Sequence, residues 1–187
     1  MKLLLTSCGF ETKEIEKVFL DMLGKDTATS QALFIPTAAI DEEAKAVLPK
    51  CYEDLIKIGF QKENIESCDV AYNCPHQPME YYDVIYITGG NTEFLMQAVN
   101  KTGFDSKIKD YLNKDGLIIG VSAGAMIFAN CTRKSLKYLR AYLEVHVEPK
   151  GKCIKRGIYL TRRLRRIRLG NEQAIVVKND KEFEVVG

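Results

Sequence analysis

Residues 116–125, Gly-Leu-Ile-Ile-Gly-Val-Ser-Ala-Gly-Ala, decide the fold. The first five residues form a short apolar run of strand length, and the apolar stretch at residues 125–129 predicts a helix after it. Between them, Gly120, Ser122 and Gly124 match the pattern G-x-S-x-G, which places a serine on a sharp turn from strand to helix. Small neighbours give the backbone room to lift the hydroxyl out of the sheet. Ser122 is therefore the candidate nucleophile.

The segments around this turn alternate between two types. Apolar runs of strand length lie at residues 3–5, 32–35, 65–70, 83–87 and 116–120. Helices are expected at residues 15–23, 44–55, 94–99, 108–112 and 125–129. This alternation is typical of a parallel sheet that is covered by helices.

The chain becomes β-rich from about residue 140. Residues 141–147 alternate between apolar and polar side chains and predict a half-solvated strand, and residues 174–186 predict a hairpin that turns at Asn179 and Asp180. No linker-like composition separates this part from the rest. We therefore predict a single α/β domain over residues 1–187. Its three layers comprise a mainly parallel sheet with helices on both faces, and its C-terminal segment is β-rich.

The composition excludes several classes of site. The chain has 187 residues, 46% of them hydrophobic, and a core of this size buries roughly 70% of the unfolded surface without metal or disulfide support. It has two histidines, His76 and His146, which excludes a zinc site built from histidines alone. The six cysteines lack a C-x-x-C pair and are expected to be reduced thiols. They are Cys8, Cys51, Cys68, Cys74, Cys131 and Cys153. We expect no metal and no cofactor.

The N-terminal sequence predicts a cytoplasmic protein. Lys2 precedes an apolar run that is far shorter than the core of a signal peptide, and acidic residues follow it closely. No stretch approaches the roughly 20 apolar residues of a membrane span. A membrane partner is therefore not expected.

A second turn, at residues 88–92, also follows an apolar strand and precedes a helix. In a parallel sheet both turns lie at the carboxyl edge, where such folds bind their ligands. The backbone amides of Gly89 and Gly90, which no side chain shields, can approach a substrate carbonyl closely. A plain helix entry that Asn91 or Thr92 caps explains the same residues equally well. The turn alone does not decide between the two.

Charge is distributed unevenly along the chain, although the net charge is only +2. Residues 1–148 carry 16 basic and 21 acidic side chains, whereas residues 149–187 carry 11 and 4. Nine basic residues and no acidic residue lie between Lys150 and Arg168. A solvated strand pair or loop explains this run best, and binding of an anionic ligand is the alternative. Only Tyr159 offers a ring for stacking on bases, so nucleic acid is not the expected partner.

Together, the two turns resemble the aspartyl dipeptidase and cyanophycinase family of serine peptidases. The matching stretches are Ile87-Thr88-Gly89-Gly90-Asn91-Thr92 and Ile119-Gly120-Val121-Ser122-Ala123-Gly124-Ala125. The resemblance covers the chain well from the first strand to about residue 129 and passably over residues 171–186. It implies a fold similar to the class I glutamine amidotransferases, with serine in place of cysteine at the turn. It also implies a hydrolase with a Ser-His-Glu triad.

The resemblance assigns roles to individual residues. Ser122 would be the nucleophile, the amides of Gly90 and Ala123 would bind the oxyanion, and Gly89 and Asn91 would contact substrate. The base follows the turn in this family, which selects His146 over His76. His146 also falls on the polar face of its predicted strand, whereas His76 lies in a proline-bounded loop.

The acidic member of the triad is the place where the sequence departs from the family. Asn171 occupies the corresponding position, and Glu172 is adjacent to it. Neighbouring residues on an extended chain point to opposite sides, so Glu172 can serve only if the register of the loop shifts. Asn171 could orient the imidazole through a neutral hydrogen bond instead.

We therefore predict a serine hydrolase that cleaves small peptides, with acidic, aspartyl-type peptides among the candidate substrates, through an acyl-enzyme. The partner would be a small peptide substrate, and the protein would be a monomer or a homodimer. The alternative is a weakened or inactive member of the family that binds an anionic partner.

Overall fold

The computed structural model describes residues 1–72, 75–148, 154–159, 162–179 and 182–187, and their backbone forms two sheets. The larger sheet has seven strands in the order β10-β9-β1-β5-β4-β2-β3. These strands are β1 (Lys2–Thr6), β2 (Ala32–Ile35), β3 (Ile65–Ser67), β4 (Val84–Ile87), β5 (Leu117–Val121), β9 (Ala174–Val177) and β10 (Phe183–Val186). The five strands from β1 to β3 in this order are parallel, and β9 runs antiparallel to both of its neighbours. The predicted mainly parallel sheet is confirmed.

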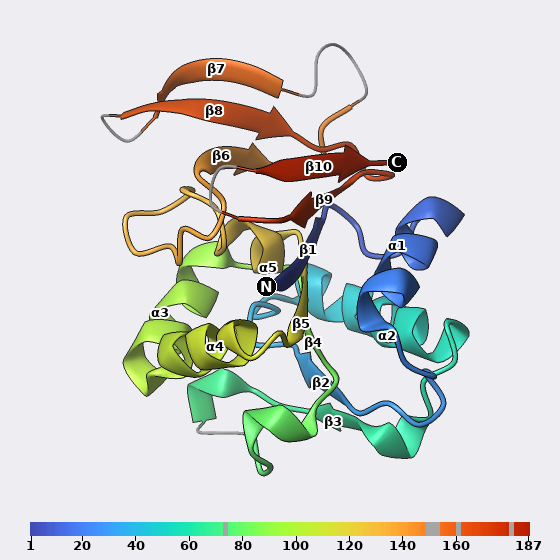
Figure 1. Ribbon diagram of the computed structural model, residues 1–187. Helices are drawn as coiled ribbons and strands as arrows, with labels where there is room; N and C mark the ends of the chain where they lie inside the picture. The colour runs from blue at the N-terminus through green and yellow to red at the C-terminus, as the bar shows by residue number, and fades with distance from the viewer. Residues whose placement is uncertain (73–74, 149–153, 160–161, 180–181) are drawn as a thin grey trace.

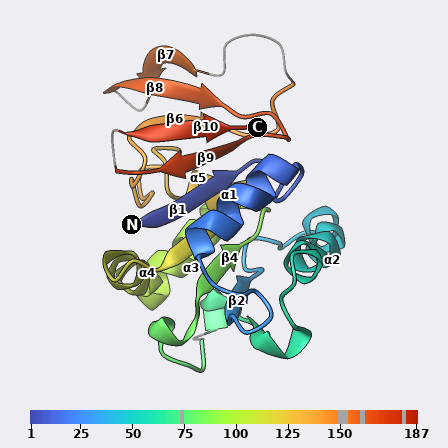
Figure 2. The ribbon, with the colours of Figure 1, turned by 45° about the vertical axis from the view of Figure 1, so that its right-hand side comes forward.

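Helices cover both faces of this sheet (Figures 1 and 2). One face packs against α1 (Lys13–Leu23) and α2 (Glu42–Lys57). The other face packs against α3 (Thr92–Thr102), α4 (Phe104–Asn113) and α5 (Ala123–Met126). Side chains of β1 alternate between the two cores, because successive residues of a strand point to opposite faces. Leu3 and Leu5 lie in the core on the α3 side, and Leu4 lies in the core on the α1 side.

The smaller sheet contains β6 (Ala141–Glu144), β7 (Ile154–Tyr159) and β8 (Arg162–Arg168) in the order β6-β8-β7. Strand β8 is parallel to β6 and antiparallel to β7, so most of the basic stretch forms a strand pair. Glu144 forms ion pairs with Arg166 and Arg168, the latter at 3.2 Å. At least two arginines of the basic stretch are therefore already bound within the protein.

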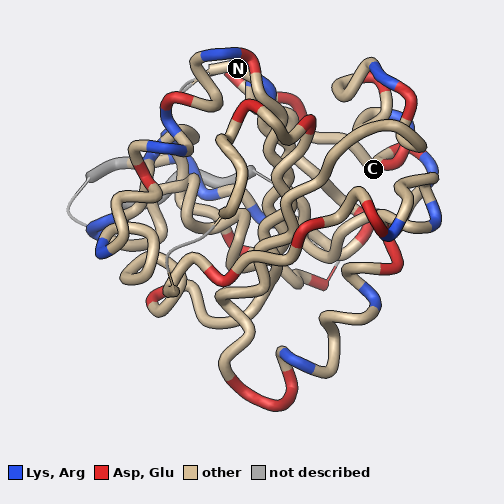
Figure 3. Tube along the Cα trace, turned by 90° about the horizontal axis from the view of Figure 1, so that it is seen from below, with Lys and Arg blue, Asp and Glu red and all other residues tan. Residues whose placement is uncertain are grey.

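Acidic and basic residues are interspersed along the outer segments of the larger α/β part (Figure 3). Most ion pairs among the described residues have at least one exposed partner, and some join two exposed groups, such as Lys45 with Glu42 at 2.9 Å. Such pairs contribute little to stability because water screens them. The fold is therefore held mainly by the two apolar cores on either side of the sheet.

Three segments differ from the sequence predictions. Strand β3 ends at Ser67, and residues 70–72 form a 3₁₀ turn instead of continuing the strand. Helix α5 begins directly after Ser122 and has one turn, rather than extending over residues 125–129. Strand β6 ends at Glu144, so His146 lies beyond the strand on which it was placed. In the first two segments the residues beyond the element are largely apolar and buried, and apolar periodicity does not distinguish such residues from a strand or helix. Residues 145–147 continue the alternation of the sequence without continuing the strand.

The expectation of reduced thiols is wrong at Cys68, which is disulfide-bonded. Cys8, Cys51 and Cys131 are free. Sequence spacing reveals metal or redox motifs, but it does not reveal which sulfurs pair in the fold. Cys74 and Cys153 lie outside the described residues, as does Asp180 at the predicted hairpin turn. In the described part of the chain, no helix is long and apolar enough to cross a membrane.

Candidate functional site

Ser122 occupies a sharp turn between β5 and α5. Its backbone angles are φ 51° and ψ −111°, a conformation that L-residues rarely adopt. The Ser122 amide donates to the carbonyl of Thr6 at 3.0 Å, and the Ser122 carbonyl accepts from Ala125 at 2.9 Å. These bonds fix the turn on both sides. The strained backbone thus presents the half-buried hydroxyl at the carboxyl edge of the sheet.

The two glycines of the motif are required by close backbone contacts. A Cβ atom on Gly120 would lie 2.5 Å from the carbonyl oxygen of Gly124. A Cβ atom on Gly124 would lie 2.3 Å from the carbonyl oxygen of Ile87. Both distances are shorter than any normal carbon–oxygen contact, so only glycine allows α5 to pack this closely on β4 and β5.

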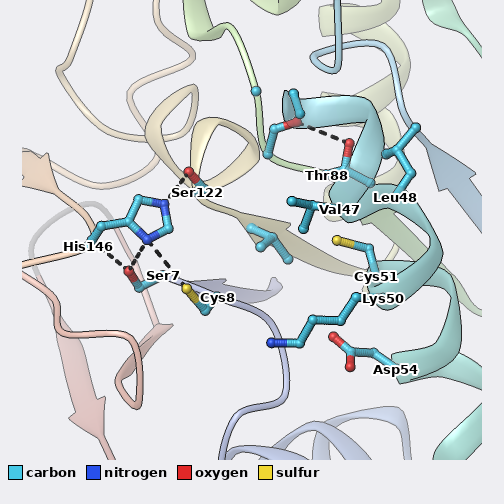
Figure 4. A pocket seen from close by; sticks show the side chains of 14 residues that line it. Ser7, Cys8, Val47, Leu48, Lys50, Cys51, Asp54, Thr88, Ser122 and His146 are labelled. Carbon is cyan, nitrogen blue, oxygen red and sulfur yellow. Dashed lines mark hydrogen bonds between the residues drawn. The ribbon is translucent and has the colours of Figure 1, made fainter. Parts of the chain in front are cut away.

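His146 contacts Ser122 through its ring (Figure 4). The Nε2 atom lies 2.9 Å from Ser122 Oγ, which is hydrogen-bonding distance. The backbone at His146 has a φ of 57°, in the left-handed region. Its amide donates to the hydroxyl of the fully buried Ser7 at 2.7 Å, and this bond holds the residue in place.

Three groups surround the other ring nitrogen of His146, Nδ1. Asn171 Oδ1 lies at 3.1 Å, Cys8 Sγ at 3.3 Å and Ser7 Oγ at 3.5 Å. An amide oxygen can only accept, so Nδ1 carries the proton and donates it to Asn171. Nε2 is then the unprotonated nitrogen, as a base toward Ser122 requires. Glu172 is exposed, and within the described residues no hydrogen bond joins it to His146.

The glycine turn lies against Ser122. A Cβ atom on Gly89 would be 3.1 Å from Cβ of Ser122. Gly90 has a φ of 132°, and a Cβ atom there would lie 2.1 Å from the carbonyl oxygen of Ala38. The side chain of Asn91 caps α3 by accepting from Phe94 N at 2.9 Å. Helix capping therefore accounts for the asparagine at position 91. Gly89 and Gly90 lie beside Ser122, and they have no side chains that would shield their backbone amides.

A cavity of about 180 Å³ opens beside Ser122 and His146. Its lining residues come from the ends of β1, β4 and β5 and from α2; they are Ser7, Cys8, Ala44, Val47, Leu48, Lys50, Cys51, Asp54, Thr88, Gly89, Gly90, Val121, Ser122 and His146. The sequence motifs did not indicate Ser7, Cys8 or Asp54. Residues 7 and 8 could have been found, because they follow a strand that is parallel to β5 and end at the same edge.

The ionisable groups of the cavity are shifted mainly by burial. Burial raises the pKa of the Cys51 thiol to about 11, and burial together with Glu11 raises that of Cys8. Both thiols are therefore protonated near neutral pH and are weak nucleophiles. Burial also raises the pKa of the Asp54 carboxyl. Ser122 is the side chain here whose nucleophilic atom faces Nε2, the unprotonated nitrogen of His146, whereas Cys8 and Ser7 face Nδ1.

His76 lies away from this site, near the β3 edge of the sheet. Its ring Nδ1 is 3.0 Å from Glu66 Oε1, and the side chain is exposed. Of the two histidines, His146 is the one that the structure brings to Ser122. No three His, Cys, Asp or Glu side chains in the described ranges are grouped so that they could hold a metal ion.

Comparison with known proteins finds similar sequences and folds. Residues 3–142 match the sequence profile of peptidase family S51. An uncharacterized peptidase of Pasteurella multocida (strain Pm70) is 30% identical over 129 residues, which are 69% of this chain and 61% of that protein. An uncharacterized peptidase of Listeria monocytogenes (EGD-e) is 35% identical over 94 residues, covering 50% and 46%. The matches thus span about half to three-fifths of the length of these curated relatives.

Two solved structures share the fold. A crystal structure of a protein named for peptidase E, from Listeria monocytogenes EGD-e, superposes with a TM-score of 0.74 at 25% identity and covers 99% of this chain and 97% of that chain. A peptidase from an acI-B1 actinobacterium gives a TM-score of 0.66 at 16% identity, over 100% and 87%. The second likeness concerns the fold alone. By the sequence match over residues 3–142, the chain belongs to peptidase family S51.

Proposed function

We propose that this protein is a serine-type peptidase that cleaves small peptides through an acyl-enzyme at Ser122. The observation that carries the proposal is the 2.9 Å contact between Ser122 Oγ and His146 Nε2, on a turn strained to φ 51°. A serine hydroxyl is a weak nucleophile unless a base in contact with it takes its proton. The membership of family S51 supports peptide hydrolysis as the reaction.

The reaction follows from the hydrogen bonds of the two side chains. His146 Nε2 takes the proton of Ser122 Oγ while the oxygen attacks the substrate carbonyl. The imidazolium then gives this proton to the amine as the peptide bond breaks. Water, deprotonated by the same nitrogen, hydrolyses the ester on Ser122 and frees the enzyme.

Two backbone amides are available for the oxyanion. The amides of Gly90 and Ala123 donate to no backbone carbonyl among the described residues. Gly90 lines the cavity, and Ala123 directly follows the nucleophile. Preformed donors stabilise the charge that develops on the substrate oxygen more than they stabilise the ground state. Each is therefore proposed to contribute to the rate rather than to substrate affinity.

Asn171 takes the position that an acid holds in the proposed triad. It accepts the Nδ1 proton at 3.1 Å and so fixes the tautomer and the orientation of the ring. A neutral amide stabilises the imidazolium less than a carboxylate does. Turnover is therefore expected to be slow, and Glu172 is assigned no direct part.

The cellular location is a separate proposal. The free thiols Cys8, Cys51 and Cys131 support the cytoplasm, whereas the disulfide at Cys68 is more typical of an oxidising compartment. We propose the cytoplasm, and cell fractionation with an antibody to the native protein tests it. Recovery from an exported fraction would contradict the proposal.

Hydrolysis of a mixed library of short peptides, followed by mass spectrometry, tests the proposed reaction. The wild type is expected to release cleaved products, and Ser122→Ala is expected to release none. The alternative of an inactive binding protein is favoured by the loss of the triad acid at position 171. It predicts that neither protein cleaves any peptide, while a ligand still protects the wild type against heat.

A further inference from the structure

The cavity beside Ser122 contains an acidic group that the proposed reaction does not use. Asp54, on α2, lines the same cavity as Ser122 and His146 and is 7% exposed. Figure 4 shows its carboxylate well apart from Ser122, with the Lys50 side chain beside it. A substrate whose carbonyl reaches Ser122 would therefore extend toward Asp54.

Only one oxygen of this carboxylate accepts hydrogen bonds from the described residues. Oδ2 accepts from the Tyr86 hydroxyl at 3.3 Å and from the Phe10 amide at 3.5 Å. Oδ1 accepts no hydrogen bond within the described residues, and no ion pair there joins Asp54 to a basic side chain. Buried carboxylates normally have a partner for each oxygen. Oδ1 is thus the atom that a ligand could bind.

The charge around Asp54 is not balanced. Lys50 also lines the cavity, but its ammonium forms an ion pair with Glu11 rather than with Asp54. The three groups together therefore carry one net negative charge when Asp54 is ionised. Burial is the largest influence on the pKa of Asp54 and raises it, although the Phe10 amide and the nearby Lys50 charge act in the opposite direction. A cation bound here would supply the missing charge.

The walls between the two ends of the cavity are apolar. Ala44, Val47, Leu48 and Val121 line it, and none of them offers a side-chain hydrogen-bonding group. An acidic substrate side chain would meet no free cation in this cavity. An alkyl group that ends in an ammonium would match both the walls and the carboxylate.

We propose that Asp54 is a specificity-determining residue that binds a primary ammonium group of the substrate on the acyl side of the scissile bond. This inference rests on the proposed function of Ser122. It replaces acidic peptides with ammonium-bearing peptides as the preferred substrates. The ammonium belongs either to a lysine side chain or to the free N-terminus, and both would bind Asp54 Oδ1 by a charge-assisted hydrogen bond.

Chromogenic p-nitroanilides test the proposal and distinguish the two sources. Lysine, norleucine and glutamate derivatives are compared, each with a free and with an acetylated α-amino group. If the side chain is bound, kcat/KM is about tenfold to a hundredfold higher for lysine than for norleucine. If the N-terminus is bound, the free form exceeds the acetylated form by a similar factor. Glutamate is expected to be the poorest of the three.

Asp54→Asn removes the charge and retains an oxygen that can accept from Tyr86 and Phe10. It is expected to reduce the ammonium-dependent ratio of kcat/KM values to about one. Glu53→Gln is the matched control, since Glu53 is an exposed carboxylate on the same helix outside the cavity. It should keep the wild-type ratio. An unchanged ratio in Asp54→Asn, or a wild type that prefers glutamate, would overturn the proposal.

If Asp54→Asn does not fold, the wild-type enzyme alone still tests the proposal. It must then prefer the ammonium-bearing substrate over norleucine, which lacks the ammonium, and the absence of this preference refutes the proposal. Failure of the proposed function would differ, because the wild type would then not react with a fluorophosphonate at Ser122. A wild type that reacts there but shows no ammonium preference refutes the role of Asp54 alone.

Discussion

Ser122 and His146 have similar unusual backbone angles, with φ of 51° and 57°, but they are held by different means. Around Ser122 the support is mainly steric: Gly120 and Gly124 let the turn, β4 and α5 pack backbone against backbone. His146 lies after the end of β6, and its amide is bound by Ser7, which is 139 residues away in the chain. The position of Ser122 thus depends on neighbouring residues that have no Cβ atom, whereas the position of His146 depends on a hydrogen bond to a residue far away in the chain.

This difference separates what a short motif can encode from what only the fold supplies. A requirement for small residues leaves a pattern in the sequence, because any Cβ atom at Gly124 would collide with Ile87. A hydrogen bond between distant residues leaves no such pattern. Four variants test the steric support of Ser122 and the hydrogen-bonded support of His146.

Removal of the base should have the largest effect. His146→Ala is expected to lower kcat for peptide hydrolysis by about 10³-fold or more, because Ser122 loses the group that takes its proton. The thermal unfolding midpoint should hardly change, since the side chain is exposed. His76→Ala is the matched control and should keep full activity. Equal losses in the two variants would contradict the role of His146.

The steric support is tested at Gly124. Gly124→Ala places a methyl group 2.3 Å from the carbonyl oxygen of Ile87. The free energy of unfolding should fall by about 1–3 kcal/mol. The displaced Ser122 should lower kcat by roughly a hundredfold. Gly103→Ala is the comparator: its Cβ would meet nothing within 4 Å, so it should affect stability through backbone strain alone and leave kcat unchanged. A fully active Gly124→Ala enzyme would argue against the steric account.

The missing acid of the triad can be restored. Asn171→Asp is expected to raise kcat by about tenfold or more, because a carboxylate 3.1 Å from Nδ1 stabilises the imidazolium that forms during attack. The acidic limb of the pH–rate profile should move to higher pH, since the same charge favours the protonated ring. Asn171→Ala should reduce activity more than Glu172→Ala. The opposite order would transfer the orienting role to Glu172.

The polar support of His146 is tested at Ser7. Ser7→Ala leaves the His146 amide without its acceptor and should cost about 1–3 kcal/mol in the free energy of unfolding. A smaller loss of kcat than in Gly124→Ala is expected, because Asn171 still contacts the ring. Ser135→Ala, which removes another buried serine that accepts from Thr132 N, should lower stability alone. If both serine variants keep full kcat, Ser7 does not position the base.

Much of the fold could be predicted from the sequence. The strands around residues 3–5, 32–35, 83–87 and 116–120 are present, because fully buried parallel strands need uninterrupted apolar runs. The helix predicted at residues 125–129 is shifted along the chain: α5 spans Ala123–Met126, and residues 127–129 are buried without belonging to α5. Burial and helical structure give the same apolar signal over so few residues.

The site could be predicted in part. Ser122 and the glycine turn follow from local patterns, and the structure brings His146 to Ser122 and Asn171 to His146. The place of Asp54 in the cavity could not be foreseen, because it depends on how α2 packs against the sheet. Ser7 could have been placed near the site, since it follows β1 at the same edge as Ser122. The disulfide at Cys68 also escaped prediction, because cysteine spacing alone does not reveal a pairing.

The proposed reaction requires that His146 activates Ser122 as a nucleophile. Labelling with a fluorophosphonate, followed by peptide mapping, measures this directly. We expect a single phosphonylated residue, Ser122. Labelling should be strongly slowed in His146→Ala and abolished in Ser122→Ala. A wild type that stays unlabelled at high probe concentration, or that reacts at another residue, would contradict it.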